Sequence, residues 1–493
     1  MGRFTRRALL LGTGAIIGAY AANRLAPWHD TSHGVAQIGE TPAGWLNDAS
    51  LLSPTPVAKH IVLSEDPGEA LIARLRAELA EARQAGRPLC LSAARHSMGG
   101  QSLPRDGTAL GWDNGQIEID SAAQTYLAPG NARWSQIIAA LDPVGMSPKV
   151  MQSNNDFGLA ATFSVNAHGW PVPHGPMGST VRGLTMMLPD GEVVTCSRDE
   201  NADLFGMAMG GYGLIGLILT MEVEAAPNMR ITPGFERMPG EGLADAFLAA
   251  LDDPAVGMAY GRLSVQRAEF LDQGLMIAYR PDEDQSDLPP ASGSGWVSRV
   301  AAHIYRAQLY REPAKRLRWW TEASLNPRLG GTSTRNSLMN EPVVTLDDGD
   351  PTRTDILHEY FVPADRWADF IAVCKQAIPP SYQEMLNVTI RYVAADKDSW
   401  LAYAPTPRLA AVMSFSQEMS DRSEADMARM TREMIDGMDR IGGSYYLPYR
   451  PHATVEQFAT IYPRAAGFAA AKRQLDPRLT LRNALWDTYL EPL

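Results

Sequence analysis

The sequence has few cysteines and no cluster of metal-ligating residues. Its 493 residues include three cysteines and nine histidines. An odd number of cysteines leaves at least one thiol unpaired, and Cys90, Cys196 and Cys374 lie in unrelated strand- or helix-like segments. His168 and His174 stand six residues apart around two prolines, which is typical of a loop and not of a pair of metal ligands. We therefore expect buried cysteines and no bound metal.

Basic residues are outnumbered by acidic ones. The chain has 44 Lys and Arg against 56 Asp and Glu, which gives a formal net charge of −12. An acidic surface argues against nucleic acid as a partner. The hydrophobic content of 45% and the charged content of 20% are typical of an ordered globular protein. A chain of this length can bury more than one core, so we expect at least two domains.

One long apolar run lies near the N-terminus, over residues 8–22, directly after a basic start. It is shorter than the ~20 residues that a membrane-spanning helix needs. We therefore interpret residues 1–21 as a signal peptide with a cleavage point after Ala21, the alternative being an uncleaved membrane anchor. Residues 5–7, Thr-Arg-Arg, partly match the twin-arginine signal, whose route exports folded proteins. These features predict an exported, periplasmic protein.

Beyond this region, strand-like and helix-like patterns alternate. Residues 60–64 and 87–92 are typical of strands, whereas residues 69–86 carry apolar side chains at helical spacing. A second helix is predicted over 134–141, and an alternating strand pair flanks the turn at 190–191. Short strands mixed with helices predict an α+β fold.

The most informative motif is the turn that follows the strand at 87–92. Residues 90–101 read Cys-Leu-Ser-Ala-Ala-Arg-His-Ser-Met-Gly-Gly-Gln and place one histidine, His96, among small residues. Because few side chains block the approach, backbone N–H groups can converge there on an anion such as a pyrophosphate. The imidazole of His96 adds a group that a phosphate cradle does not need and that can bond covalently to a flavin.

Two further motifs follow in the chain, GLAATFSVNAHG at 158–169 and LPDGEVVTCSRDENADLFGMAMGGYGLIGLILTMEVE at 188–224. With residues 90–101 they resemble the FAD domain of the vanillyl-alcohol oxidase family, also called the PCMH-type domain. Alditol and aldonolactone oxidases and decaprenylphosphoryl-ribose oxidase are similar members. The resemblance covers residues 55–225 well and 355–493 more loosely, where a Tyr-Pro, Phe, Arg, Leu-Asp-Pro and Asn spacing carries it.

The resemblance implies an α+β fold with a two-subdomain PCMH-type FAD-binding domain and an inserted α+β cap domain for the substrate. The expected boundaries are 55–228 for the FAD-binding domain, 229–443 for the cap and 444–493 for the C-terminal return into the FAD-binding domain.

The resemblance also implies FAD as the cofactor. In relatives that read Arg-His-Ser or Gly-His-Ser at this turn, the histidine is bonded to the flavin 8α-methyl group, so we expect covalent FAD at His96. The alternative is a His96 that only hydrogen-bonds to phosphate or backbone. The other residues expected to bind or line the FAD are Leu91, Ser92, Ala93, Ala94, Arg95, Ser97, Ser153, Gly158, Ala161, Val165, Asn166, Ala167, His168 and Ile218.

The segment Gly211–Gly216 matches the GxGxxG pattern of dinucleotide-binding folds, but its context differs. Those folds need a strand before the glycines and a helix after them. Here a helix-like segment precedes the glycines and a strand-like run follows them. We therefore exclude a nicotinamide site and attribute the glycines to tight packing of that strand against the flavin.

Candidate catalytic residues lie on an alternating segment at 385–405. One face carries Leu386, Val388 and Ile390, and the other carries Asn387, Thr389 and Arg391. A polar face on a central-looking strand indicates a lined cavity, because buried polar groups need partners. Alditol oxidases carry a glutamate and an arginine two residues apart on the matching strand. Arg391 matches the arginine, whereas Thr389 stands in the place of the glutamate.

A second departure from the family occurs at Tyr449, where relatives place a lysine. A tyrosine can donate a hydrogen bond but brings no positive charge. We therefore predict a site with Arg391 as its cation, Tyr449 as a donor, and Asn387 and Thr389 beside them. Further polar residues on neighbouring strands, each equally compatible with an ordinary half-exposed strand, are His358, Glu359, Ser414 and Ser416.

Residues 296–320 combine an excess of basic residues with Trp319 and Trp320 at their end. This pattern fits either an amphipathic helix on an anionic membrane or a helix that covers its own domain and presents a solvated basic face. We favour the second because Pro313 interrupts the helix and no long apolar face is present. Peripheral membrane contact through 296–320 stays the alternative.

The resemblance implies an FAD-dependent oxidoreductase that oxidises a CH–OH group of a sugar, polyol, lactone or glycolipid by hydride transfer to flavin N5. Oxygen, a quinone or a cytochrome would accept the electrons. The alternatives are a quinone- or cytochrome-linked dehydrogenase, a cytokinin-type C–N oxidase, and a flavin-binding protein without catalysis.

Overall fold

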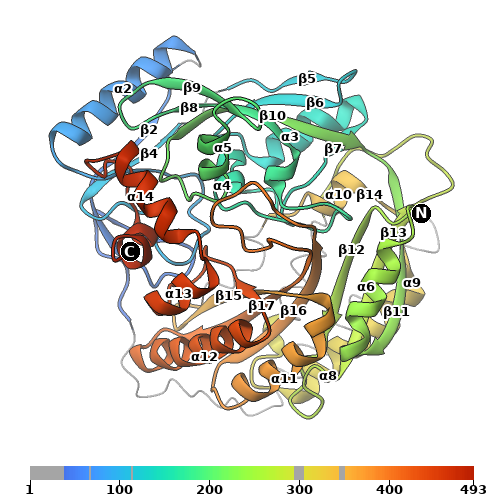
Figure 1. Ribbon diagram of the computed structural model, residues 1–493. Helices are drawn as coiled ribbons and strands as arrows, with labels where there is room; N and C mark the ends of the chain where they lie inside the picture. The colour runs from blue at the N-terminus through green and yellow to red at the C-terminus, as the bar shows by residue number, and fades with distance from the viewer. Residues whose placement is uncertain (1–37, 66–67, 113–114, 294–304, 343–349) are drawn as a thin grey trace.

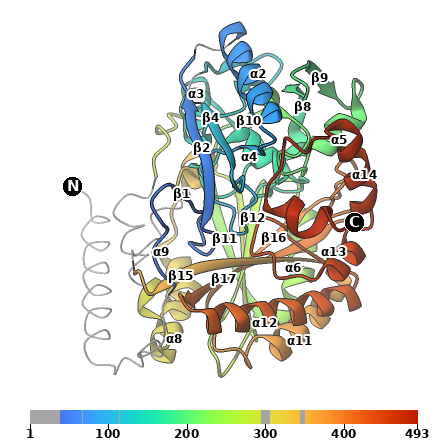
Figure 2. The same ribbon diagram turned by 90° about the vertical axis from the view of Figure 1, so that its left-hand side faces the viewer.

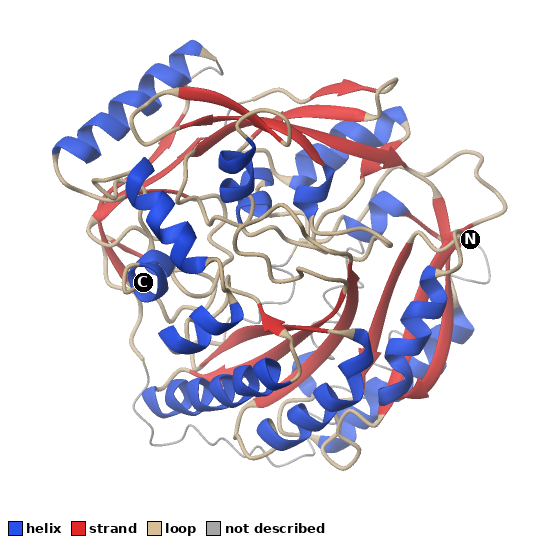
Figure 3. Ribbon diagram, viewed as in Figure 1, coloured by secondary structure: helices blue, strands red, loops and turns tan. Residues whose placement is uncertain are grey.

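The computed structural model describes residues 38–65, 68–112, 115–293, 305–342 and 350–493. The predicted signal peptide at 1–21 lies outside the described residues. The described chain combines three β-sheets with helices, which confirms the predicted α+β class (Figure 3). The division into a two-subdomain FAD-binding domain and an inserted cap, with its boundaries, stays an interpretation.

The first sheet contains the predicted strand–helix–strand unit. Its strand order is β1 (Trp45–Leu46), β2 (Thr55–Leu63), β4 (Gly107–Trp112) and β3 (Leu89–Leu91). The helix α2 (Glu69–Gln84) carries the chain from β2 to β3, and β2 and β3 both pair with β4 in parallel. Leu71, Leu75 and Leu79 of α2 recur at helical spacing and are buried in one cluster with Leu110 of β4.

The second sheet is antiparallel. Its order is β5 (Glu118–Asp120), β6 (Thr125–Pro129), β10 (Leu217–Pro227), β8 (Val181–Met187) and β9 (Val193–Ser197), with β7 (Met146–Pro148) also paired to β10. The predicted hairpin around 190–191 is β8–β9, and the predicted helix is α3 (Trp134–Leu141). Trp134, Ile137 and Leu141 of α3 are fully buried in the main core.

The third sheet, called the large sheet below, contains eight strands. Its order is β14 (Ser333–Thr334), β11 (Arg230–Pro239), β13 (Gln273–Pro281), β12 (Met258–Leu263), β16 (Glu384–Val393), β17 (Arg408–Glu418), β15 (Arg353–Val362) and β18 (Ser444–Tyr445). In Figure 1 it lies below the two other sheets, and in Figure 2 β15 and β17 run above α12. The helix α12 (Asp421–Arg440) begins after Ser420, whose side chain accepts a hydrogen bond from Ser423 N.

Helices cover the outer face of the large sheet, and its other face points toward the first two sheets (Figure 1). The remaining α-helices are α4 (Leu159–Ser164), α5 (Ala202–Ala208), α6 (Leu243–Leu251), α8 (Glu312–Trp320), α9 (Asn326–Leu329), α10 (Arg335–Met339), α11 (Trp367–Ala377), α13 (Val455–Ile461) and α14 (Ala465–Leu475). Short 3-10 segments run over Asp142–Val144, Met177–Thr180, Gly240–Gly242 and Ala364–Arg366, and π-helical turns over Thr321–Leu325 and Trp486–Leu490.

The C-terminal segment returns to the first sheet. Leu481 forms a parallel bridge with Leu89 of β3, and Leu89 N donates a hydrogen bond to Thr480 O at 2.6 Å. Residues that are almost 400 positions apart in the sequence therefore lie side by side.

The glycines at 211–216 stand between α5 and β10, as the sequence pattern indicates. At least one of these glycines, Gly216, is required by packing against protein, and packing of the strand against the flavin stays a prediction. A Cβ atom at Gly216 would lie 2.4 Å from the Met186 side chain and 2.8 Å from the Met187 carbonyl oxygen. Gly216 thus allows β10 to approach β8.

In the described part of the basic segment several charged side chains point inward, whereas Arg316 is exposed. Lys315 is buried and forms an ion pair with Glu384 at 2.9 Å, and Arg318 donates to the Asn387 side chain at 2.9 Å. Pro313 does not interrupt α8 but stands in its first turn, where proline is tolerated. These contacts favour a helix that covers its own sheet, and membrane contact through 296–320 stays a prediction.

The three cysteines are buried and unpaired, as predicted. Burial raises the pKa of Cys90 to about 12. Among the described residues, no helix is long and apolar enough to cross a membrane. The same residues contain no group of three or more His, Cys, Asp or Glu side chains that could hold a metal ion.

Candidate functional site

The turn around His96 presents unused backbone donors. Within the described chain, the N–H groups of residues 93–97 donate no hydrogen bond to another protein atom, although these residues are half-buried. Arg95 has a φ of +54°, in the left-handed region. Successive N–H groups in such a conformation form a concave site for an anion. The turn therefore fits the pyrophosphate cradle predicted from its sequence.

His96 lies beside a second predicted cofactor segment. Its ring centroid is 4.4 Å from that of Phe157, and its Nε2 atom is 3.2 Å from Asp156 Oδ2, without hydrogen-bond geometry. A Cβ atom at Gly158 would lie 2.8 Å from the Cβ atom of Ala93. The two segments thus approach each other closely, and the small residues in both are required for it.

The backbone opposite this pair is equally tight. A Cβ atom at Gly130 would lie 2.3 Å from the carbonyl oxygen of Ile218, another predicted cofactor residue. Asn166 uses its side chain within the fold, because its Nδ2 atom donates to Asp396 at 2.9 Å and its Oδ1 atom accepts from Gly178 N. Asn166 therefore shapes the loop at 165–168 and has little capacity left for a ligand.

A glutamate that the sequence offered only as one of several options lies at the centre of the site. Glu359 of β15 pairs with Val412 of β17, which pairs with Thr389 of β16. Directly opposed residues of an antiparallel sheet point to the same face. Glu359 therefore shares the polar face that carries Asn387, Thr389 and Arg391, a face that the alternation at 385–393 predicts correctly.

The Glu359 carboxylate is 3% exposed and binds two predicted site residues. Its Oε1 atom is 2.5 Å from His168 Nε2, and its Oε2 atom accepts a hydrogen bond from the Tyr449 hydroxyl at 3.2 Å. Burial first, and the nearby Glu359 charge second, raise the pKa of Tyr449 well above its ordinary value. The phenol therefore stays protonated and acts as a donor. His168, predicted to line the flavin, belongs to this cluster.

Arg391 connects the large sheet to the loops that precede β8. Its Nη2 atom donates to Ser153 Oγ at 2.6 Å and its Nη1 atom to His168 O at 3.3 Å, whereas its buried Nε atom has no hydrogen-bond partner in the described part of the chain. Burial lowers the pKa of Arg391, and the charge of Glu359 opposes this shift. Arg391 thus brings a fixed cation beside the carboxylate.

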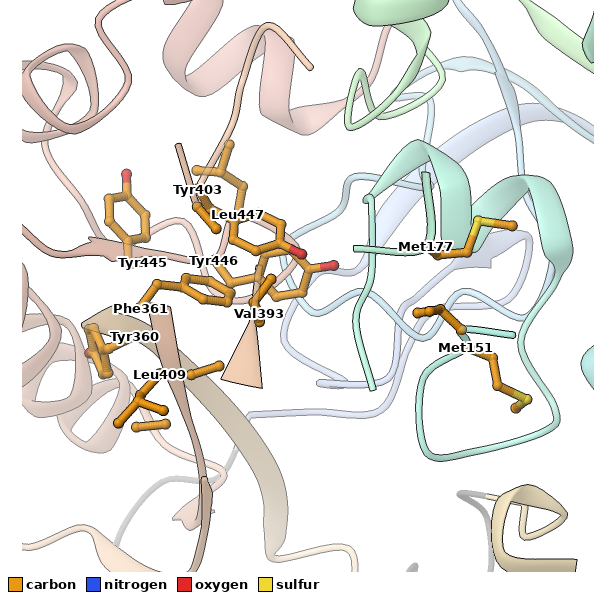
Figure 4. Packing of buried hydrophobic residues seen from close by; sticks show 14 of the residues in the cluster. Met151, Met177, Tyr360, Phe361, Val393, Tyr403, Leu409, Tyr445, Tyr446 and Leu447 are labelled. Carbon is orange, nitrogen blue, oxygen red and sulfur yellow. The ribbon is translucent and has the colours of Figure 1, made fainter. Parts of the chain in front are cut away.

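Three aromatic side chains pack against the His168 ring. Phe361, Tyr403 and Tyr446 pack together at the end of β15 (Figure 4), and the ring centroid of Phe361 is 5.4 Å from that of His168. The Tyr446 hydroxyl donates to Val165 O at 2.8 Å and the Tyr403 hydroxyl to Asn166 O at 2.6 Å. These contacts hold the loop at 165–168 rigidly against the large sheet.

Asn387 and Thr389 share the face but not the cluster. Arg318 donates to Asn387 Oδ1, and Arg262 donates to Thr389 Oγ1. Arg262 was not foreseen, although its alternation with Tyr260 on β12 places both on the same face. The polar strip therefore continues from Glu359 through Thr389 to Arg262.

The site fits a bound FAD. The unused N–H groups at 93–97 suit its pyrophosphate, His96 lies next to that cradle, and the Glu359 cluster faces the same region from the large sheet. The residues that would hold FAD are the turn at 91–97 and the segments at 153–161 and 165–168. His96 is the one residue among them that would supply a covalent bond.

Comparison with known proteins gives the same picture. A family profile described as an FAD binding domain matches residues 71–197. Cytokinin dehydrogenase 7 of Oryza sativa subsp. japonica is 32% identical over 139 residues, which are 27% of this chain and 26% of the plant protein. The chain thus matches about a quarter of that relative's length. Alditol oxidase of Streptomyces sp. is 22% identical over 414 residues, covering 82% of this chain and 90% of the oxidase.

A third relative, L-gulonolactone oxidase of Mus musculus, is 23% identical over 266 residues, which are 53% of this chain and 55% of the mouse protein. The profile match contains both the His96 turn and the loop at 165–168. Residues 71–197 therefore match an FAD binding domain, and FAD is the cofactor of this chain.

Proposed function

We propose that the protein is an FAD-dependent oxidoreductase that oxidises a CH–OH group of a sugar, polyol, lactone or glycolipid. The observation that carries this proposal is the buried Glu359 carboxylate, joined to His168 and Tyr449 and lying beside Arg391. Oxidation of an alcohol removes a proton from oxygen and a hydrogen with two electrons from carbon. FAD, when bound, accepts the two electrons and the hydrogen from carbon.

Glu359 takes the hydroxyl proton in this proposal. Its carboxylate is held in place by His168 Nε2 and the Tyr449 hydroxyl, so the acceptor oxygens are preorganised before the substrate arrives. Burial excludes most water from the carboxylate. Within the described chain, no other Asp or Glu side chain forms a hydrogen bond or ion pair with these three side chains.

Arg391 orients the substrate oxygen and balances the charge of Glu359. Its two bonds to Ser153 and His168 fix the guanidinium plane, and its Nε atom keeps an unused donor. Tyr449 contributes a neutral donor at the position where relatives have a lysine. The positive charge of the site therefore comes from the sheet and not from the C-terminal segment.

Glu359 compensates for the glutamate that is absent at position 389. The two positions lie in one cross-strand row with Val412 between them, which separates their backbones by roughly 10 Å at the usual strand spacing. The carboxylate has thus moved along the row to β15, and the substrate would lie closer to β15 than in an enzyme with the family's usual glutamate.

The long match to alditol oxidase favours a CH–OH donor over a C–N donor. It covers 82% of this chain, and therefore includes much of the large sheet, whereas the match to cytokinin dehydrogenase 7 covers 27%. The residues on the substrate side of the site are therefore more similar to those of the sugar alcohol and lactone oxidases.

An anaerobic substrate panel tests this function. The purified yellow protein is mixed with alditols, aldonolactones, aldoses, a glycolipid and a cytokinin, and flavin bleaching is recorded. We expect bleaching by at least one polyhydroxylated substrate and none by the cytokinin. Bleaching by the cytokinin alone would contradict the proposal. Adding air and then a quinone to the bleached protein identifies the electron acceptor.

The cofactor link and the cellular location complete the proposal. His96 would carry the FAD covalently, because its ring lies next to the predicted pyrophosphate cradle. The sequence of the first 21 residues supports export to the periplasm with the FAD already loaded.

A further inference from the structure

Gln101 joins the flavin-binding turn to the segment that carries Tyr449. Its Nε2 atom donates to Leu447 O at 2.7 Å and to Tyr449 O at 3.0 Å, and its Oε1 atom accepts from Gly99 N at 2.9 Å. The side chain is 5% exposed. Both amide hydrogens and the amide oxygen are therefore used. The two bonds from Nε2 join the two segments, and the bond to Oε1 fixes the side chain within the turn.

The contact is unusually close. A Cβ atom at Gly99 would lie 2.5 Å from Tyr449 O and 2.6 Å from Gln101 Nε2, so only glycine permits the approach. Met98 N adds a hydrogen bond to Pro448 O at 2.7 Å. The carbonyl groups of Leu447, Pro448 and Tyr449 are thus all bonded to Met98 or Gln101, which follow His96 in the same turn.

The same segment is attached to the large sheet at one end. Tyr446 N donates to Glu359 O at 3.0 Å, while the Tyr449 hydroxyl reaches the Glu359 carboxylate. The Tyr449 phenol therefore depends on two supports, β15 and the His96 turn. Gln101 is the support from the turn that binds the carbonyl of Tyr449 itself.

We propose that Gln101 is a positioning residue, which holds Tyr449 on Glu359 and couples this contact to the flavin-binding turn. This inference rests on the proposed function. Gln101 does not touch the reacting atoms. It acts through Tyr449, so its removal should matter only while the Tyr449 hydroxyl is present.

The chain offers a matched control. Gln383 is also 5% exposed, and its Nε2 atom donates at 2.9 Å to the carbonyl oxygen of Ser423, which lies in the first turn of α12. Gln383→Ala removes a buried amide of the same kind without touching the site. The test variants are Gln101→Ala and Gln101→Glu, of which the second keeps the size of the side chain and removes both donors. The bonds of Arg450 to Glu424 and Ser53 remain in both and preserve the fold.

The first measurement needs no substrate. In the FAD-loaded full-length protein labelled with 3-fluorotyrosine, the fluorine signal of Tyr449 is assigned with Tyr449→Phe. We expect the signal to shift in both Gln101 variants and to stay in place in Gln383→Ala. An unchanged signal in a folded Gln101 variant overturns the proposal, whether or not the proposed reaction exists.

The second measurement is a double-mutant cycle on the rate of flavin bleaching. We expect Gln101→Ala to lower kcat roughly tenfold with little change in KM, about the effect of one to two neutral hydrogen bonds. In the Tyr449→Phe background the same substitution should change kcat less than about twofold. Fully additive losses would show that Gln101 does not act through Tyr449. A parent protein that no panel substrate bleaches would contradict the proposed function and leave the fluorine result to decide on Gln101.

Discussion

Replacement of Arg391 by lysine separates charge from geometry in the site. The guanidinium uses two different nitrogens for Ser153 and His168 O, and its buried Nε atom has no hydrogen-bond partner among the described residues. A lysine keeps the charge, but its single ammonium group lacks the planar fork that makes these contacts together. We therefore expect Arg391→Lys to resemble Arg391→Ala and not the parent.

The expected size follows from the role. One preorganised electrostatic group is worth ~2–4 kcal/mol of transition-state stabilisation. This corresponds to a fall in kcat/KM of roughly 30- to 900-fold. The loss should lie mainly in kcat if Arg391 acts on the transition state and mainly in KM if it only binds the substrate.

The assay is stopped-flow bleaching of the FAD-loaded protein with the best panel substrate. Arg280→Lys serves as control, because Arg280 forms an exposed ion pair with Asp253 far from the site. Near-parent turnover in Arg391→Ala would remove Arg391 from the site. Full activity in Arg391→Lys alone would show that charge suffices and would refute the geometric argument.

Three further predictions concern the cofactor, stability and export. His96→Ala should release its flavin on acid precipitation, whereas the parent precipitate should stay yellow; free FAD in the parent supernatant would leave His96 as a noncovalent neighbour. Burial lowers the pKa of His358 to about 3, with a smaller contribution from His452. Between pH 6.5 and 3 the unfolded chain therefore carries a proton on His358 that the folded chain does not. The contribution of His358 to the free energy of unfolding is thus greatest above pH 6.5 and is lost as the pH falls toward 3. His358→Gln should flatten this dependence in urea titrations at pH 7 and pH 5, and an equal slope in both proteins would assign it to other groups. Replacing Arg6 and Arg7 by lysine should leave the protein in the cytoplasm, and periplasmic protein on fractionation would disprove the twin-arginine assignment.

Local patterns were sufficient for much of the fold. The helical spacing at 69–86 and the predicted helix at 134–141 correspond to α2 and α3, and the hairpin around 190–191 was also predicted. In each case the apolar residues recur with the period of the element that they form. The three-sheet arrangement could not be read in this way, because sheet order depends on contacts between distant segments.

The central residue of the site illustrates this limit. Glu359 was one of several polar residues on a strand, and only the pairing of β15 with β17 and of β17 with β16 places it in the row of Thr389. Strand register is set by tertiary packing and not by the sequence of one strand. Arg391 and Tyr449 could be predicted as site residues because the family resemblance has an arginine and a lysine at the corresponding positions. Gln101 lay at the end of the most informative motif, yet its role depends on residues almost 350 positions away.

The central claim is that the Glu359 carboxylate takes the hydroxyl proton during oxidation of a CH–OH group. The most direct test compares anaerobic flavin bleaching in the parent and in Glu359→Gln, which keeps the size of the side chain and an oxygen that can accept from Tyr449. Loss of a general base lowers the rate by about 10²–10⁴-fold, so we expect bleaching slower by that factor with FAD still bound. Bleaching within about threefold of the parent rate would contradict the account.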